Sequence, residues 1–282
     1  MQLSYKGGKT GQLIFHPALS RRDLAWGSRT CNTRFIEGSG IGFGVAEACT
    51  ENGALVTVSS SNPERCTKAV ARLQEAYPSA KDRIWGLKVD LGNQETLEEE
   101  LKGLFEKAVA AMGGEKLDHV IYTAGDALKQ MALADMTVKN IIQAGQVRFF
   151  APLLVAKFLP TYLNSSYKSS YTITTGAVAD RPIPNWSVIA SYAGGGASMV
   201  RNLALDLKPI RVNGVSPGVV DTELWDAFGS ELKPKILESM RSKLATDRVG
   251  SSEDVAETYL GLLKDYNVDG VFVKSDGGAF VM

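Results

Sequence analysis

Three glycines at alternate positions, in the stretch Gly38-Ser39-Gly40-Ile41-Gly42, stand directly before an expected helix. Glycine allows the chain to turn tightly and lets a ligand approach the backbone. The free N–H groups at a helix start favour an anion. We interpret the five residues as a dinucleotide-pyrophosphate site. A glycine-rich turn without a ligand is the alternative, because a glycine cluster alone is weak evidence.

Hydroxyl and amide side chains follow the short strand expected over residues 55–58. Ser60, Ser61 and Asn62 stand there, and Arg65 comes one helical turn later. Sites specific for NAD place a carboxylate near this strand end to hold the ribose hydroxyls. No carboxylate stands here, so we favour NADP(H), whose 2′-phosphate these groups can bind. The alternative is that Ser61 and Asn62 only cap the following helix.

The chain carries a series of ordered motifs over residues 38–282, and together they resemble the short-chain dehydrogenase/reductase family. The matching stretches are Gly40-Ile41-Gly42, Asp90-Leu91, Thr123-Ala124-Gly125, Arg201 to Leu207, Arg211 to Gly218, Thr222, Arg248-Val249-Gly250, Glu253 to Ala256 and Asp276-Gly277-Gly278.

The resemblance implies positions for the cofactor. Asp90 and Leu91 would flank the adenine, and Ala124 and Gly125 would line the cofactor. The loop from Pro217 and Gly218 to Thr222 would meet the nicotinamide.

The residues that usually perform this family's chemistry are missing. The family uses Asn, Ser, Tyr and Lys, in acid–base and oxyanion-type roles. Alignment back from Arg201-Asn202-Leu203-Ala204 gives Arg148 at the asparagine position, Gly176 at serine, Ile189 at tyrosine and Ala193 at lysine. A rival alignment makes Tyr192 the tyrosine, but its lysine position is then Gly196.

A rebuilt site is one explanation of these departures. Arg148 would project toward the nicotinamide, and a buried arginine needs a partner. We expect Arg148 and Asp180 to be the catalytic residues, as a carboxylate–arginine pair, with Asp126 as a second candidate partner. The alternatives are a solvated Arg148, and an Asp180 that belongs only to a proline-stiffened loop.

Loss of the tyrosine favours particular substrates. Reduction of a ketone needs a proton at oxygen, whereas an iminium acceptor is already cationic. The sequence therefore favours an NADP(H)-dependent oxidoreductase that reduces an imine, iminium or activated double bond of a small hydrophobic metabolite. It resembles tetrad-deficient reductases of fungal specialised metabolism. A catalytically silent nucleotide-binding scaffold and a non-redox cyclase or isomerase are the other hypotheses.

Strand-like and helical segments alternate from residue 41 onward. This alternation predicts an α/β fold with one Rossmann-type, doubly wound parallel sheet in a single domain over residues 38–282. Strands are expected over 55–58, 84–89, 120–123, 171–175, 210–215 and 271–273, and a long helix over Thr137–Leu159. Gly194-Gly195-Gly196 would let a partner subunit approach the helix over 190–207, which predicts a homodimer or homotetramer.

Residues 1–37 form an atypical N-terminal segment. A central strand should be almost continuously apolar, but of residues 28–36 only Phe35 and Ile36, the last two, form such a run. The family pattern would place its first glycine at Ile36, and Glu37 follows near the expected pyrophosphate. We hypothesise a faulty gene model, such as a retained intron or a wrong start, which the transcript sequence tests.

Composition excludes several other functions. The 282 residues include 31 Lys or Arg and 31 Asp or Glu, so the chain lacks the basic excess of a nucleic-acid or membrane binder. No apolar run has the length of a membrane span. With two histidines and no carboxylate cluster at ligand spacing, no metal site is expected, and His119 is interpreted as a core residue. Three cysteines without a C-x-x-C pair indicate a cytoplasmic protein with reduced thiols.

Overall fold

Parallel strands form the centre of the chain. The computed structural model describes residues 40–126, 130–223, 225 and 229–282. Within them β1 pairs with β2, and a second sheet has the order β3-β4-β5-β6; every pairing is parallel. The strands are β1 (Val56–Ser60), β2 (Ile84–Lys88), β3 (His119–Tyr122), β4 (Ser170–Thr174), β5 (Arg211–Pro217) and β6 (Phe272–Ser275).

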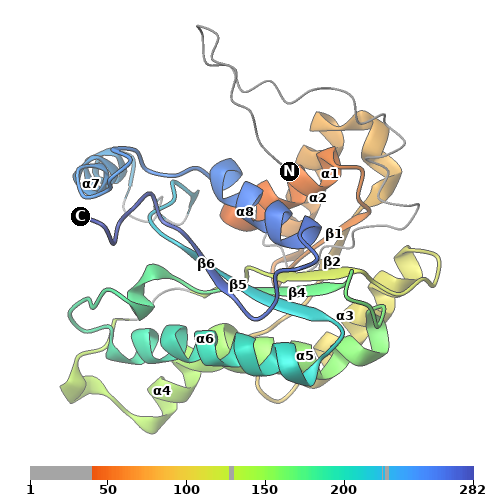
Figure 1. The fold of residues 1–282 in the computed structure, drawn as a ribbon, viewed down its shortest axis with the longest axis horizontal. Coiled ribbons are helices and arrows are strands. Elements are labelled where there is room, and N and C mark those ends of the chain that lie inside the picture. The colour runs from red at the N-terminus through yellow and green to blue at the C-terminus, as the bar shows by residue number, and fades with distance from the viewer. Residues whose placement is uncertain (1–39, 127–129, 224, 226–228) are drawn as a thin grey trace, which may run out of the picture.

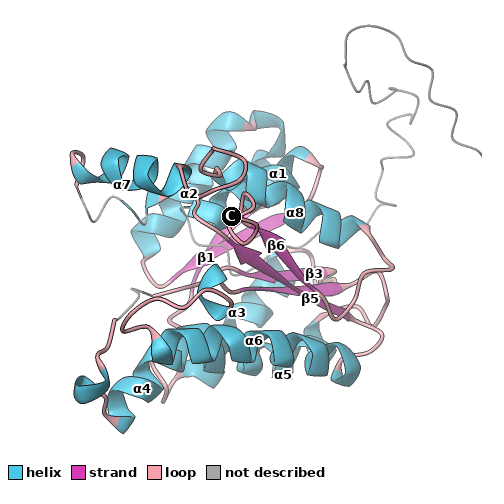
Figure 2. Cartoon of the chain, turned by 60° about the vertical axis from the view of Figure 1, so that its left-hand side comes forward, coloured by secondary structure: helices cyan, strands magenta, loops and turns pink. Residues whose placement is uncertain are grey.

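Helices cover both faces of the strands (Figure 1). The helices are α1 (Gly40–Glu51), α2 (Pro63–Ala76), α3 (Leu97–Ala111), α4 (Val138–Gly145), α5 (Ala151–Tyr162), α6 (Ser187–Asp206), α7 (Leu232–Arg241) and α8 (Ser252–Lys264). One hydrophobic cluster joins α1, α2 and α8 to the strands, and another joins α3, α5 and α6 to the opposite face. Figure 2 shows the same two layers above and below the strands. The doubly wound parallel architecture expected from the sequence is therefore confirmed.

The two sheets are separate in the part of the chain that the structure describes. No described strand pairs with both β1 and β3. The sequence lacks an apolar run before Gly38, which is where a central strand would arise. Residues 1–39, with the unusual segment 1–37, Gly38 and Ser39, lie outside the described residues.

The expected long helix contains a π-helical turn. Residues Gln146–Phe150 (η3) connect α4 to α5 with the wider π pattern. The buried Gln146 amide donates to the Leu91 carbonyl at 3.2 Å. The Tyr122 hydroxyl donates to the Val147 carbonyl. These two bonds fix the turn to the ends of β2 and β3.

Helix α1 packs tightly against α8. A Cβ atom on Gly44 would lie 2.8 Å from the Ser252 carbonyl oxygen, so a larger residue must separate the helices. A capping box between Ser251 and Asp254 starts α8 at this point. The close contact fixes the N-terminus of α1 relative to the sheet.

We expect Gly44→Ala to be about 1–3 kcal/mol less stable than the matched variant Gly103→Ala, because the new methyl group clashes with backbone. Gly103 lies in α3 with open space around it, so alanine there should be neutral or stabilising by about 1 kcal/mol. Urea unfolding of both variants measures the difference. Equal unfolding free energies would contradict this packing.

His119 is a core residue, as the sequence predicted. Its ring is 1% exposed, and Nδ1 lies 2.8 Å from the Ser170 hydroxyl. Burial, with a smaller contribution from the positive charge of Arg211, lowers the pKa of His119 to about 3. The folded chain therefore keeps this imidazole neutral.

This low pKa gives a prediction for acid stability. The unfolded chain binds the proton near pH 6.5 and the folded chain only near pH 3, so the unfolding free energy falls as the pH decreases between them. From pH 6.5 to 5 this loss should be about 1.5 kcal/mol smaller in His119→Gln than in the wild type. Denaturant titrations at both pH values measure it, and parallel pH dependences would refute it.

Candidate active site

The carboxyl ends of the strands bring the predicted cofactor residues to one edge. Ser60 ends β1, Asp90 and Leu91 follow β2, and Ala124 and Gly125 follow β3. Pro217 ends β5, and Gly218 comes next. A parallel sheet of this kind binds ligands in the crevice outside this edge. Gly40 and Ile41 begin α1, whose buried Gly42 lies in the first turn.

The loop after β5 reaches the start of α1. Gly218 lies so close to β6 that a Cβ atom would come within 2.6 Å of the Asp276 backbone. Farther along the loop, the Thr222 side chain lies 3.4 Å from the Cβ position of Gly40. Two regions that the sequence predicts to bind the cofactor, about 180 residues apart in sequence, therefore meet.

The end of β1 has the polar character expected of it. The Asn62 side chain accepts the backbone N–H groups of Glu64 and Arg65 at 2.8 and 3.4 Å and caps α2. The Ser60 hydroxyl accepts the Asn62 N–H at 3.3 Å. Ser61 and Arg65 are exposed beside them. Asn62 therefore caps α2, and the roles of Ser61 and Asn62 toward a cofactor stay predictions.

Arg148 pairs with Asp126 at this edge. Its Nε donates to Asp126 Oδ1 at 2.9 Å, and Nη2 donates to the Asp126 main-chain carbonyl. The two side chains are 31% and 34% exposed, so the pair is half-buried. Three guanidinium atoms lie 2.8–3.0 Å from the Cβ position of Gly125, so a side chain there would displace the Arg148 guanidinium from its place across the backbone.

The expected partnership between Arg148 and Asp180 is wrong. Asp180 forms an ion pair with Lys274 at 2.9 Å, and both side chains are about half exposed. The neighbouring Arg181 donates to the Ala279 carbonyl at 2.8 Å. Asp126 is nearer because it follows β3, next to the π-helical turn that carries Arg148. The distance along the sequence gave no means of choosing between the two carboxylates.

Tyr192 has a structural role. Its hydroxyl donates to the Ile141 carbonyl at 3.0 Å, and its ring contacts those of Phe149 and Phe150. Burial raises the pKa of this phenol. A proton donor at neutral pH would need the opposite shift. Ile189, at the other possible tyrosine position, is buried and has no ionisable group.

The glycine run in α6 is explained partly within the chain. A Cβ atom on Gly195 would lie 2.9 Å from the Phe149 ring, and one on Gly196 would lie 2.7 Å from the Thr175 methyl group. Close packing of α6 on β4 and the π-helical turn therefore requires these two glycines. Only Gly194 has open space around its Cβ position.

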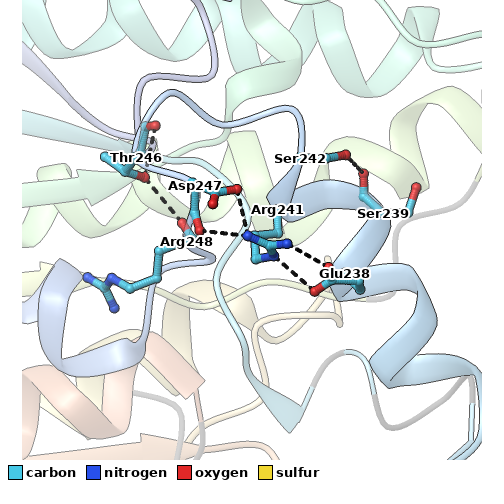
Figure 3. Close-up of polar contacts among 8 residues, drawn as sticks. Glu238, Ser239, Arg241, Ser242, Thr246, Asp247 and Arg248 are labelled. Carbon is cyan, nitrogen blue, oxygen red and sulfur yellow. Dashed lines mark hydrogen bonds and ion pairs between the residues drawn. The ribbon is translucent and has the colours of Figure 1, made fainter.

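Polar contacts hold α7 beside the site. Lys233 forms an ion pair with Asp221 at 3.0 Å and donates to the Thr222 carbonyl at 3.3 Å. At the other end of α7, Arg241 binds both carboxylate oxygens of Glu238 and also Asp247 (Figure 3). The Lys233 contacts connect the start of α7 to the loop that meets α1, and the Arg241 contacts connect its end to the segment that follows the helix.

Within the described residues, no group of three or more His, Cys, Asp or Glu side chains could hold a metal ion. A search of those residues also finds no helix long and apolar enough to cross a membrane.

Comparison with known proteins identifies the family. Residues 28–282 match the family model described as an SDR-like Rossmann domain. The chain belongs to the short-chain dehydrogenase/reductase family. It is 44% identical to the short-chain dehydrogenase/reductase fsr5 of Gibberella fujikuroi, over 86% of this chain and 91% of that protein.

Further relatives come from fungal specialised metabolism. The chain is 39% identical to the short-chain dehydrogenase/reductase malC of Malbranchea aurantiaca, over 93% of this chain and 98% of the relative. The solved structure of the MalC reductase/Diels–Alderase superposes with a TM-score of 0.85, covering 93% of this chain and 99% of MalC. The fold and the oxidoreductase family are thus established.

Double-mutant cycles should separate the two ion pairs. We expect a coupling free energy of about 1 kcal/mol between Arg148 and Asp126, and about 0.3 kcal/mol between the more exposed Asp180 and Lys274. The variants are Arg148→Met with Asp126→Asn, and Lys274→Met with Asp180→Asn. Equal couplings, or a larger one for Asp180, would show that the half-buried pair is not the stronger.

Proposed function

We propose that the chain is an NADP(H)-dependent reductase with a non-standard active site. The observation that carries the non-standard site is the Arg148–Asp126 pair at the carboxyl edge of the strands, in a chain that lacks the family's tyrosine and lysine. When bound, NADPH supplies a hydride. The residues proposed to hold it are Gly38 to Gly42, Ser60 to Asn62, Arg65, Asp90, Leu91, Ala124, Gly125, Pro217, Gly218 and Thr222.

The substrate proposed is an imine or iminium, or an activated double bond, in a small hydrophobic metabolite. An iminium carbon accepts a hydride and becomes an amine carbon without a simultaneous proton transfer. An acid such as the missing tyrosine is then unnecessary. The partly buried rings of Phe149, Phe150 and Tyr192, with centroids 5.2–5.9 Å apart, are proposed as the apolar surface that this substrate meets beside Arg148.

The Arg148–Asp126 pair has a chemical consequence for such a substrate. A lone guanidinium would repel a cationic iminium, but Asp126 balances its charge. The guanidinium can then donate hydrogen bonds to a neutral acceptor on the substrate and orient it. We propose Arg148 as the substrate-orienting residue and Asp126 as its positioning residue. Asp180, which is about half exposed and pairs with Lys274, is proposed as a group that exchanges protons with the substrate.

A second candidate function is a cyclisation without redox chemistry. It is favoured by the MalC structure, because the name of that 38% identical relative contains both reductase and Diels–Alderase. The same apolar surface and orienting arginine would serve such a reaction. Hydride transfer separates the two candidates.

Cofactor preference tests the proposal. We expect NADPH to bind about tenfold more tightly than NADH in calorimetry. Arg65→Ala should remove most of that difference, because it removes a charge-assisted bond to the 2′-phosphate. Lys68→Ala, which removes an equal charge from the same exposed helix, is the matched control. Tighter NADH binding, or equal effects of both variants, would refute the NADP(H) assignment.

A further inference from the structure

The N-terminus of α1 is already bound by an anion from the chain itself. Glu223 Oε2 accepts the Gly40 backbone N–H at 2.7 Å. Gly40 is the first residue of α1, and no acidic residue stands in the helix's first turn. The positive end of the helix dipole and the free amides at this end stabilise a carboxylate. They are the same groups that the proposed function assigns to the cofactor pyrophosphate.

We propose that Glu223 is an internal competitor for the cofactor pyrophosphate, an inference that rests on the proposed function. The Gly40 amide has one hydrogen to donate, so the Glu223 carboxylate and a phosphate oxygen cannot both receive it in the same geometry. Two anions at the same helix end also repel each other. Glu223 must therefore leave the helix end when the dinucleotide binds, which lowers cofactor affinity.

Contacts of the loop that carries Glu223 hold this residue close to the N-terminus of α1, so its side chain can return there when the cofactor leaves. Asp221 donates its N–H to the Gly250 carbonyl at 2.9 Å, and Trp225 Nε1 donates to the Val220 carbonyl at 2.8 Å. Thr222 rests against Gly40. With Asp221 bonded to Gly250 and Thr222 packed against Gly40 immediately before Glu223, displacement requires only rotation of this exposed side chain. The same movement frees space next to Thr222, where the nicotinamide end is expected.

Glu223→Gln tests this competition. The amide keeps the size of the side chain and removes its charge, so NADPH should bind about fivefold more tightly than to the wild type, in proportion to a helix-dipole interaction of about 1 kcal/mol. Glu223→Ala should give an equal or larger gain. Glu231→Gln, which removes the charge of an exposed carboxylate directly before α7, is the control and should change nothing.

The possible outcomes separate this inference from the cofactor proposal. If all four chains bind NADPH with equal affinity, or the Glu223 variants bind it more weakly, the competition is overturned and the cofactor proposal stands. If none of them binds NADPH or NADH, the cofactor proposal fails. Inorganic pyrophosphate is then the probe: tighter binding to Glu223→Gln than to the wild type supports the competition, and equal or absent binding overturns it.

Discussion

The backbone hydrogen bonds that join β3, β4 and β5 in parallel are the constraint on which the candidate site depends. In a parallel sheet all carboxyl ends lie at one edge. The residues after β3 and after β5 therefore lie at the same edge of the sheet, although they are far apart in sequence. The π-helical turn is attached to the same edge by Gln146 and Tyr122. The parallel strand pairing and the attachment of the π-helical turn therefore fix the positions of Arg148, Asp126 and Gly218.

The site is organised around one charge pair where the family normally uses a proton relay. A half-buried arginine needs a carboxylate, and Asp126 supplies both its side-chain and its main-chain oxygen. Gly125 provides the space that the guanidinium needs above the backbone. The three residues thus form one unit, in which a change of any member alters the position of the other two. In the proposed function, this unit would orient the substrate and balance its charge, and it would not deliver protons.

The sequence was sufficient for the parts of the fold that depend on local pattern. Apolar runs located the strands within one or two residues, and Asn62-Pro63 marked the start of α2. The π-helical turn was not predictable, because a change in hydrogen-bond spacing leaves hydrophobic periodicity almost unaltered. The sequence could not decide whether Asp180 or Asp126 pairs with Arg148, because that choice depends on where the strands end in space. The contact between Glu223 and Gly40 could not be predicted from local sequence pattern, because the two residues are 183 positions apart. Gly195 and Gly196 were predicted to let a partner subunit approach, which stays a prediction, and the structure adds that they make room for Phe149 and Thr175 of the same chain.

Transfer of deuterium from NADPH labelled at C4 tests the central claim most directly. The wild-type chain is given a panel of hydrophobic cyclic imines, each beside the ketone of the same ring size, and products are analysed by mass spectrometry and NMR. The account predicts deuterium on the former imine carbon and little or none on the matched ketones. Reduction of the ketones in preference to the imines, or absence of deuterium from every product while NADPH is bound, would contradict it.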